Sequence, residues 1–265
     1  MKKYNWNAQD YKKHSQTQQK WAKELIEKLN PKETEDILDL GCGDGKITAE
    51  IASCVSNGSV IGVDNAESMI ELASKQYPTI YHPNLSFILM DVAQLSFKEQ
   101  FDIIFSNAAL HWVQNHKAIL ERIYNALRSG GRLLLQMGGK GNAEHIFSIV
   151  KDLQKKKEWE PYFNNFVFPW GFHGKNEYTQ WLQKSGFDVK RVQLIPKDMT
   201  HNGQQGLEGW IRTTWLPYIE RIPEEKKDLF ISELASNYIN KFPLDSKGNV
   251  HIPMIRLEAE AIKTA

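Results

Sequence analysis

Apolar residues recur at intervals of three and four between Ser15 and Leu29, which is the spacing of one face of an amphipathic helix. Shorter apolar runs follow, each separated from the next by a helix-length segment, at 37–40, 60–63, 85–89, 101–105 and 132–137. Strands alternating with helices are typical of βαβ units and a parallel sheet. The near-continuous apolar character of the runs also fits strands that helices cover on both faces. This part of the chain is therefore predicted to be α/β.

The pattern changes after Met137. Gly130-Gly131, just before the fifth run, predicts the C-cap of a helix ending near Arg128. Beyond Met137 the sequence predicts helices at 143–156 and 177–184, an aromatic-rich connection at 159–172, a sixth strand at 187–195, helical segments at 207–219 and 224–241, and a last strand near 250–262. The last two helical segments are interpreted as a cap over the sheet.

A glycine-rich turn, Asp39-Leu40-Gly41-Cys42-Gly43-Asp44-Gly45, joins the first strand to the helix that begins at Lys46. Glycine allows positive φ and lets the backbone approach a ligand closely. Dinucleotide-binding folds place a similar loop here, but their third glycine would stand at Lys46. Asp44 would also repel a pyrophosphate at the helix start. The loop favours S-adenosylmethionine (SAM), a sulfonium without phosphates.

Three acidic residues follow three of the predicted strands. Asp39 ends the first strand, Asp64 the second, about twenty residues beyond the loop, and Asp91 follows the third. A ligand lying across the carboxyl edge of an open parallel sheet would meet all three. The alternative is that each carboxylate only caps a helix, a role that Asp performs well.

With this loop and these acids the sequence resembles the class I SAM-dependent methyltransferases. The resemblance implies an α/β fold with a Rossmann-like, seven-stranded, mostly parallel sheet, helices on both faces and a helical cap inserted before the last strand. It implies that Asp39 and the glycine loop serve the methionine end of SAM, Asp64 the ribose, and Asp91 with the Val92 amide the adenine, with S-adenosyl-L-homocysteine as product. The implied cofactor-binding residues are Asp39, Gly41, Gly43, Gly45, Asp64, Asn65, Met69, Asp91, Val92 and Asn107.

The stretch Phe105–Val113, after the fourth strand, resembles the trans-aconitate and the juvenile hormone acid methyltransferases, which methylate carboxylates. Trp6-Asn7 with Tyr11 and the pair Gln19-Lys20 add to the resemblance. It implies that the Gln19 amide and the Trp112 indole orient a substrate carboxylate. A carboxylate, with a pKa of about 4, is already ionised at neutral pH, so transfer needs alignment and desolvation and no general base.

Aromatic residues are frequent in the predicted cap, and the substrate pocket is expected to include Tyr11, Trp170 and Trp215. An apolar chamber would suit a fatty or isoprenoid acid, or the terminal carboxylate of an acyl thioester, better than a small polyanion. The only arginines of this region are Arg191, Arg212, Arg221 and Arg256.

Other functions stay open from the sequence. His111 would orient the substrate or form a pocket wall, or it would act as the base of an O- or N-methyltransferase for a neutral nucleophile. Gln18 is the alternative to Gln19. A malonyl-carrier-protein carboxyl methyltransferase, with an acyl carrier protein as partner, and a catalytically silent SAM-fold binding protein are the remaining alternatives.

Composition excludes several partners. A net charge of +1 gives no field to hold nucleic acid. Two cysteines, no signal-like start and no long apolar run predict a cytoplasmic protein with no membrane contact. The histidine spacing predicts no metal.

Residues 1–265 are predicted to form one domain, with a lid helix in 1–30, a cofactor-binding core at 36–137 and cap segments at 140–186 and 204–241.

Overall fold

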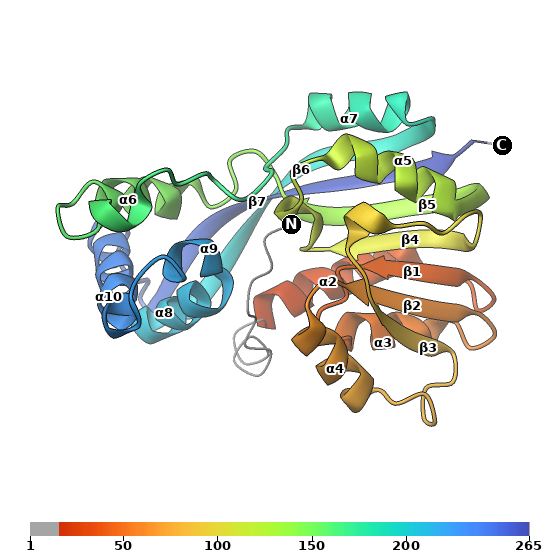
Figure 1. The fold of residues 1–265 in the computed structure, drawn as a ribbon, viewed down its shortest axis with the longest axis horizontal. Coiled ribbons are helices and arrows are strands. Elements are labelled where there is room, and N and C mark those ends of the chain that lie inside the picture. The colour runs from red at the N-terminus through yellow and green to blue at the C-terminus, as the bar shows by residue number, and fades with distance from the viewer. Residues whose placement is uncertain (1–15, 265) are drawn as a thin grey trace.

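The computed structural model describes the backbone of residues 16–264 and the side chains of residues 21–264. Its centre is a seven-stranded sheet with the strand order β3-β2-β1-β4-β5-β7-β6 (Figure 1). The strands are β1 (Asp36–Leu40), β2 (Ser59–Asp64), β3 (Leu85–Leu89), β4 (Phe101–Asn107), β5 (Leu127–Gly138), β6 (Phe187–Asn202) and β7 (Asn249–Lys263). Only β7 runs antiparallel to its neighbours, so the predicted mostly parallel sheet is confirmed.

Helices cover both faces of the sheet. One core lies under α2 (Gln16–Leu29) and α3 (Lys46–Cys54), where Leu25 and Ile51 pack on Ile37 and Phe105. The opposite face is covered by α5 (His116–Ala126), through side chains such as Leu120. The helix α4 (Glu67–Gln76) packs beside β2 and β3. Because β1 lies between β2 and β4, the strand order reverses there, at the position where ligands bind in open α/β sheets.

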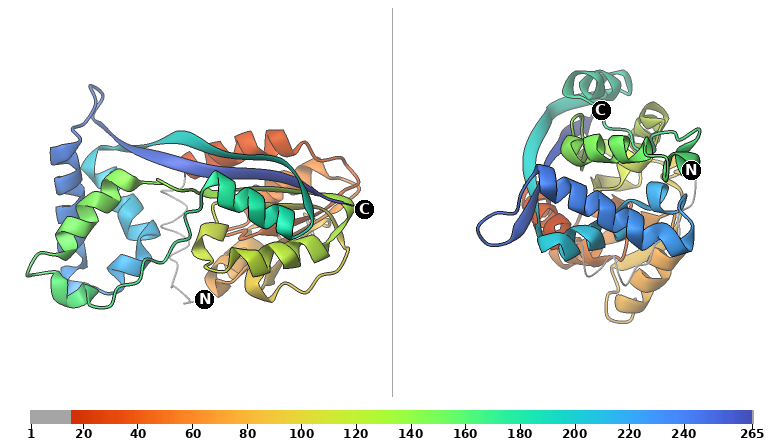
Figure 2. Two further views of the ribbon diagram at one scale, coloured as in Figure 1. Left: turned by 90° about the horizontal axis from the view of Figure 1, so that it is seen from above. Right: turned by 90° about the vertical axis from the view of Figure 1, so that its left-hand side faces the viewer.

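A second lobe is built on the outer part of the β6–β7 hairpin (Figures 1 and 2). The strands stay paired from Phe187↔Lys263 to Asn202↔Asn249, well beyond the end of β5. On this extension lie the cap helices, which are α6 (Glu144–Gln154), α8 (Gly203–Thr214), α9 (Leu216–Ile219) and α10 (Glu224–Lys241). The insertion of α8, α9 and α10 before the last strand confirms the predicted helical cap.

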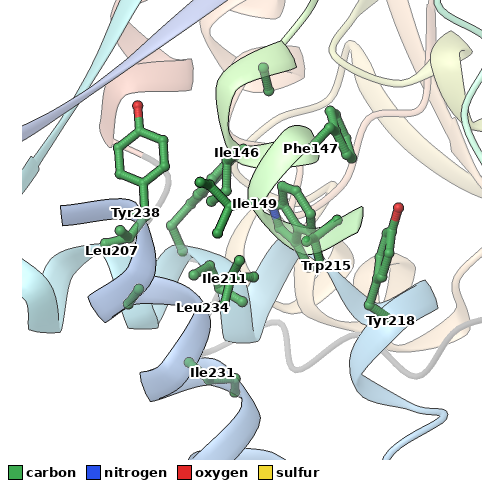
Figure 3. Close-up of a cluster of buried hydrophobic side chains, with 14 of the residues drawn as sticks. Ile146, Phe147, Ile149, Leu207, Ile211, Trp215, Tyr218, Ile231, Leu234 and Tyr238 are labelled. Carbon is green, nitrogen blue, oxygen red and sulfur yellow. The ribbon is translucent and has the colours of Figure 1, made fainter. Parts of the chain in front are cut away.

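The cap has its own apolar core. Its members come from the cap helices and from the outer half of β7, where Val250 and Ile252 are fully buried. Figure 3 shows side chains of α6, α8 and α10 pointing toward one another, among them Ile146, Ile211 and Leu234. Since β7 also contributes Leu257 and Ala259 to a sheet core, one strand connects both lobes.

The structure corrects three of the predicted elements. Gly130-Gly131 lies inside β5, because α5 ends at Ala126 and Leu127 is its C-cap. The predicted helix at 207–219 is two helices separated at Trp215, since Pro217 in the first turn of α9 has no N–H to continue α8. The sixth strand extends to Asn202 and not to 195.

The predicted cap segment 140–186 also divides between the lobes. Its first part forms α6 and the short helix η3 (Glu160–Phe163), which pack in the cap. Its last part, α7 (Lys175–Lys184), instead buries Tyr178 and Leu182 in the core of the sheet beside α5. A turn at Gly186, with φ of 94°, returns the chain directly into β6, so α7 stays beside its own strand. The division into one domain with these segments stays a prediction.

Candidate active site

A cavity of about 480 Å³ extends from the glycine loop after β1, across the carboxyl ends of the strands, into the cap. Its wall at the loop end includes Gly41, Gly43, Asp64, Asn65 and Val92. Its wall at the cap end is mostly apolar and aromatic. The cap-side lining residues include Phe147, Val167, Phe168, Pro169, Trp170, Phe172, Met199, Trp210, Trp215 and Met254. One cavity therefore joins the predicted cofactor end to the predicted substrate end.

The glycine loop has the backbone that its sequence predicts. The N–H groups of Gly41 and Cys42 both donate to the carbonyl of Val63, at 2.8 and 3.0 Å, which ties the loop to β2. Gly45 has φ of 78°, and a Cβ there would lie 2.6 Å from the Phe87 ring. Gly43 has φ of 55°, and a Cβ there would meet no atom within 4 Å. Gly45 is therefore needed for packing, whereas Gly43 leaves open space for a ligand above the loop.

Asp64 connects the loop to the end of β2. Its Oδ2 accepts a hydrogen bond of 3.0 Å from the Gly43 N–H, and its Oδ1 accepts one of 2.9 Å from the Ala66 N–H. Burial raises the pKa of this carboxyl, and the hydrogen bonds from the backbone of Ala66, Gly43 and Asn65 oppose that rise. The remaining lone pairs of a carboxylate held in this way can accept from the hydroxyls of a ribose.

Two of the predicted acids do not line the cavity. Asp39 is 2% exposed, and its carboxylate accepts a hydrogen bond of 2.7 Å from the Thr48 hydroxyl. Burial raises the pKa of Asp39 to about 7, and the charge of Asp64 adds to the rise. The carboxylate of Asp91 accepts from the Ala93 N–H at 2.8 Å, so it caps the short helix η1 (Val92–Gln94). The helix-cap role considered from the sequence is thus present at Asp91.

His111 and Trp112 lie in a single turn, η2 (Leu110–Trp112), directly after β4, and both line the cavity. The N–H of Gly138 points at Nδ1 of His111 over 3.5 Å. Burial lowers the pKa of His111 well below its ordinary value, and the nearby positive charge of Arg256 adds to this. A neutral His111 that accepts this hydrogen bond at Nδ1 would carry its proton on Nε2. The indole of Trp112 packs edge-on against Trp170, with ring centroids 5.3 Å apart.

The structure also places Arg256 in the cavity wall, where the sequence analysis did not put it. Arg256 lies on β7, is 4% exposed, and its guanidinium carbon is 5.5 Å from the centroid of the Trp21 ring. The signal in the sequence is the alternation Arg256, Glu258, Glu260 within an apolar strand. It becomes informative only once β7 is known to be an internal strand between β5 and β6.

Most of the other sequence-predicted site residues come together. The cavity is lined by Gly41, Gly43, Asp64, Asn65, Met69, Val92, Asn107, His111, Trp112, Trp170 and Trp215, whereas Asp39, Gly45 and Asp91 do not line it. Gln19 lies in the first turn of α2, and its side chain, like Tyr11, is outside the described residues. The roles of all these residues stay predictions. Sequence reasoning also missed Asn142, Phe147, Met199 and Met254.

Within the described part of the chain, no group of three or more His, Cys, Asp or Glu side chains could hold a metal ion. Across those same residues, no helix is both long and apolar enough to span a membrane.

Comparison with known proteins adds an independent finding. A family model described as a methyltransferase domain matches residues 31–186. A protein of Invertebrate iridescent virus 6 named as a methyltransferase is 30% identical over 235 residues, which is 89% of this chain and 86% of the viral one. The trans-aconitate 2-methyltransferase of Variovorax paradoxus is 26% identical over 269 residues, covering 98% of this chain and 99% of its own.

Solved structures are similar in fold. A protein of Bacillus halodurans C-125 named as a methyltransferase superposes with a TM-score of 0.64 at 18% identity, over 92% of this chain and 99% of its own. The Haemonchus contortus phosphoethanolamine N-methyltransferase 2, in complex with phosphomonomethylethanolamine and S-adenosylhomocysteine, superposes with a TM-score of 0.59 at 19% identity. The match covers 93% of this chain and 53% of the Haemonchus contortus chain.

Proposed function

Because this chain belongs to the family of methyltransferase domains and is a SAM-dependent methyltransferase, we propose that it methylates the carboxylate of a small-molecule acid to give a methyl ester. The observation that carries the proposal is the single cavity that joins the glycine loop to an aromatic chamber through His111 and Trp112. The similarity to trans-aconitate 2-methyltransferases over nearly the whole chain supports a carboxylate acceptor.

The loop end of the cavity fits the cofactor. The open space above Gly43 admits a ligand against the backbone, and Asp64 lies beside it with its carboxylate already oriented by two N–H groups. Met69, Met90 and Val92 form an apolar surface beyond Asp64, of the kind that a flat adenine ring contacts. SAM supplies a methyl group on a positively charged sulfonium, which an ionised oxygen attacks without further activation.

The residues after β4 would orient the acceptor. Neutral N–H donors from the Trp112 indole and from Nε2 of His111 would hold a carboxylate without locking it in a tight ion pair, so its oxygen stays nucleophilic. The contact of Nδ1 with the Gly138 N–H and the lowered pKa of His111 support a role as donor over a role as base. The aromatic cap would exclude water during transfer.

The chamber also constrains the acceptor. Phe147, Trp170 and Trp215 pack against one another, with the ring centroids of Phe147 and Trp215 4.7 Å apart, and all three line the cavity. Such walls favour an acid with an apolar or aromatic body over a small polyanion. A malonyl thioester on a carrier protein is the other acid to be tested. The proposal includes a cytoplasmic location and no nucleic-acid or membrane partner. Of the lid helix predicted in 1–30, residues 1–15 lie outside the described residues.

The experiment is a methyl-transfer assay with SAM radiolabelled on its methyl group. Purified protein is incubated with aliphatic, isoprenoid and aromatic acids, trans-aconitate and a malonyl thioester, and the base-labile label of methyl esters is counted. Labelled ester that falls at least about tenfold in Trp112→Phe, while SAM binding by calorimetry is retained, supports the proposal. SAM binding with no labelled ester from any of these acids would refute it.

A further inference from the structure

On each of four elements the cavity stops where the apolar core of the cap begins. On β7, Met254 lines the cavity, whereas Ile252, two residues further along the strand, is fully buried in the cap core. On α6, Phe147 lines the cavity, and Val150, one turn further along the helix, belongs to the same core. The cavity therefore has a closed end inside the cap.

Two methionines lie at this closed end. On β6, Met199 is the register partner of Ile252, so Met254 is its diagonal neighbour on the same face of the β6–β7 hairpin. Met199 and Met254 both line the cavity, as does Trp210 of α8, whereas Leu207, one turn earlier on that helix, lies in the cap core. A methionine side chain is unbranched and flexible, so it adapts its shape to the end of a ligand.

Polar side chains in this part of the wall are engaged with the backbone. The hydroxyl of Thr214 donates a hydrogen bond of 2.6 Å to the carbonyl of Trp210 in the same helix. The side-chain oxygen of Asn142 accepts one of 3.2 Å from the N–H of Ile255. A hydrocarbon loses no hydrogen bonds to water when it enters such a space, so the closed end suits an apolar part of the acceptor.

The closed end is far from the residues proposed to orient the reacting carboxylate. Asn107, the last residue of β4 before η2, is in register with Gln136 on β5, and Gln136 is in register with Glu258 on β7. Met254 lies four residues, roughly 13 Å, further along β7, and β7 is two strand spacings, roughly 10 Å, from β4. The Cα atoms of Asn107 and Met254 are thus roughly 16 Å apart. An acceptor that reaches both places must be extended.

We propose that Met199 and Met254 form the end wall of the acceptor pocket and set the length of its substrate, an acid with an extended, unbranched aliphatic chain. The carboxylate reacts beside η2, and the end of the chain contacts the two thioethers. This inference rests on the proposed function and deepens it. Because the cavity of about 480 Å³ must also hold SAM, a slender chain, which reaches the end wall with the least volume, fits the remaining space best.

The test is a series of straight-chain acids from hexanoic to tetradecanoic acid. Their binding is measured by calorimetry in the presence of S-adenosylhomocysteine, at concentrations below micelle formation. Each methylene group buried in the pocket should lower the Kd about fourfold, until the chain reaches the methionines and the Kd stops falling. Benzoic and cinnamic acids, which are too short to reach the end wall, should bind at least about tenfold more weakly than the acid at this break.

Substitution of either methionine should move the break. We expect Met254→Ala and Met199→Ala to shift it by about two carbons toward longer acids, because each leaves space where the thioether ended. Met254→Phe, which fills that space with a bulkier ring, should shift it toward shorter acids. Met137→Ala is the matched control, because Met137 is a buried methionine of β5 in a sheet core and does not line the cavity. Its break should stay at the wild-type length.

Thermal melts and the affinity for S-adenosylhomocysteine report whether each variant is folded, and Met254→Phe probes the same wall if a truncated protein unfolds. A break at one length in all the proteins, a Kd that does not depend on chain length, or no binding of any straight-chain acid would overturn the inference. Absence of labelled ester from the wild type, with a break that moves in the variants, would overturn the proposed function and leave the end wall established.

Discussion

The backbone N–H of Gly43 donates a 3.0 Å hydrogen bond to Oδ2 of Asp64, so the glycine loop and the end of β2 are braced through one carboxylate. The other oxygen is engaged by the Ala66 N–H at 2.9 Å. An acid at this position thus shapes the loop as well as facing the cavity.

Asp64→Asn should therefore affect both stability and cofactor binding. An amide offers one acceptor oxygen where the carboxylate offers two, so either the Gly43 or the Ala66 N–H loses its acceptor. We expect the free energy of unfolding to fall by about 1–3 kcal/mol and the Kd for SAM to rise at least about tenfold. Urea unfolding and calorimetry measure the two effects. An unchanged Kd would remove Asp64 from the cofactor site, whatever its effect on stability.

Gly43→Ala tests the open space above the loop. Alanine at this position must adopt the positive φ of Gly43, which should lower the free energy of unfolding by about 1–2 kcal/mol, although no atom obstructs the new methyl group. Gly130→Ala is the matched control, because Gly130 also has positive φ, 73°, with nothing near its Cβ, and does not line the cavity. Both variants should lose similar stability in thermal melts, and only Gly43→Ala should weaken SAM binding, by about tenfold or more. Equal SAM affinity in the two would place the cofactor elsewhere.

The rate of ester formation should be insensitive to pH around neutrality. A carboxylate acceptor is ionised above about pH 5, and burial holds the pKa of His111 well below its ordinary value of about 6.5, so neither group titrates above that pH. We expect kcat/KM to be flat between about pH 6.5 and 9, in the wild type and in His111→Gln, with a lower plateau in the variant. A wild-type rate that climbs tenfold per pH unit and loses that slope in His111→Gln would identify His111 as a base.

Acid should destabilise the protein through His116. Its ring is buried, 3.3 Å from the Tyr178 hydroxyl and 4.4 Å between centroids from His173. Burial lowers the pKa of His116 to about 3, and the charge of His173 contributes. Between about pH 6.5 and 3, His116 is therefore protonated in the unfolded chain but not in the folded protein. The free energy of unfolding falls as the pH decreases through this range, by up to about 1.4 kcal/mol per pH unit.

The matched pair for this effect is His116→Phe and His145→Phe. Loss of the titrating ring at position 116 should flatten the decline of unfolding free energy with acid, measured by urea titration at several pH values. His145 is exposed and stacks on Phe242, so its replacement should leave the slope unchanged. A slope that is the same in all three proteins would show that His116 is protonated in the folded state.

The cavity wall at the glycine loop could be predicted from the sequence because its determinants are local. Gly41, Gly43 and Gly45 follow one apolar run, Asp64 ends the next, and parallel strands bring such ends together. The cavity wall formed by the cap could not be predicted in this way, because it depends on pairings between segments that are distant in the sequence. Arg256 reaches the cavity only through its register with Gly138 on β5. Periodicity likewise identified α7 as a helix, but only tertiary packing of Tyr178 decides that it lies on the sheet.

The ends of the cap insertion meet at a single point of the β6–β7 hairpin. Asn202 and Asn249 are register partners, and the Gly203 N–H donates to the Gly248 carbonyl at 3.1 Å. The chain that leaves the ribbon to build α8, α9 and α10 thus returns to the place it left, as it would across an ordinary hairpin turn. A change in the length or sequence of this segment would therefore alter the cap side of the cavity, while the parallel part of the sheet keeps its strands, its register and its connections.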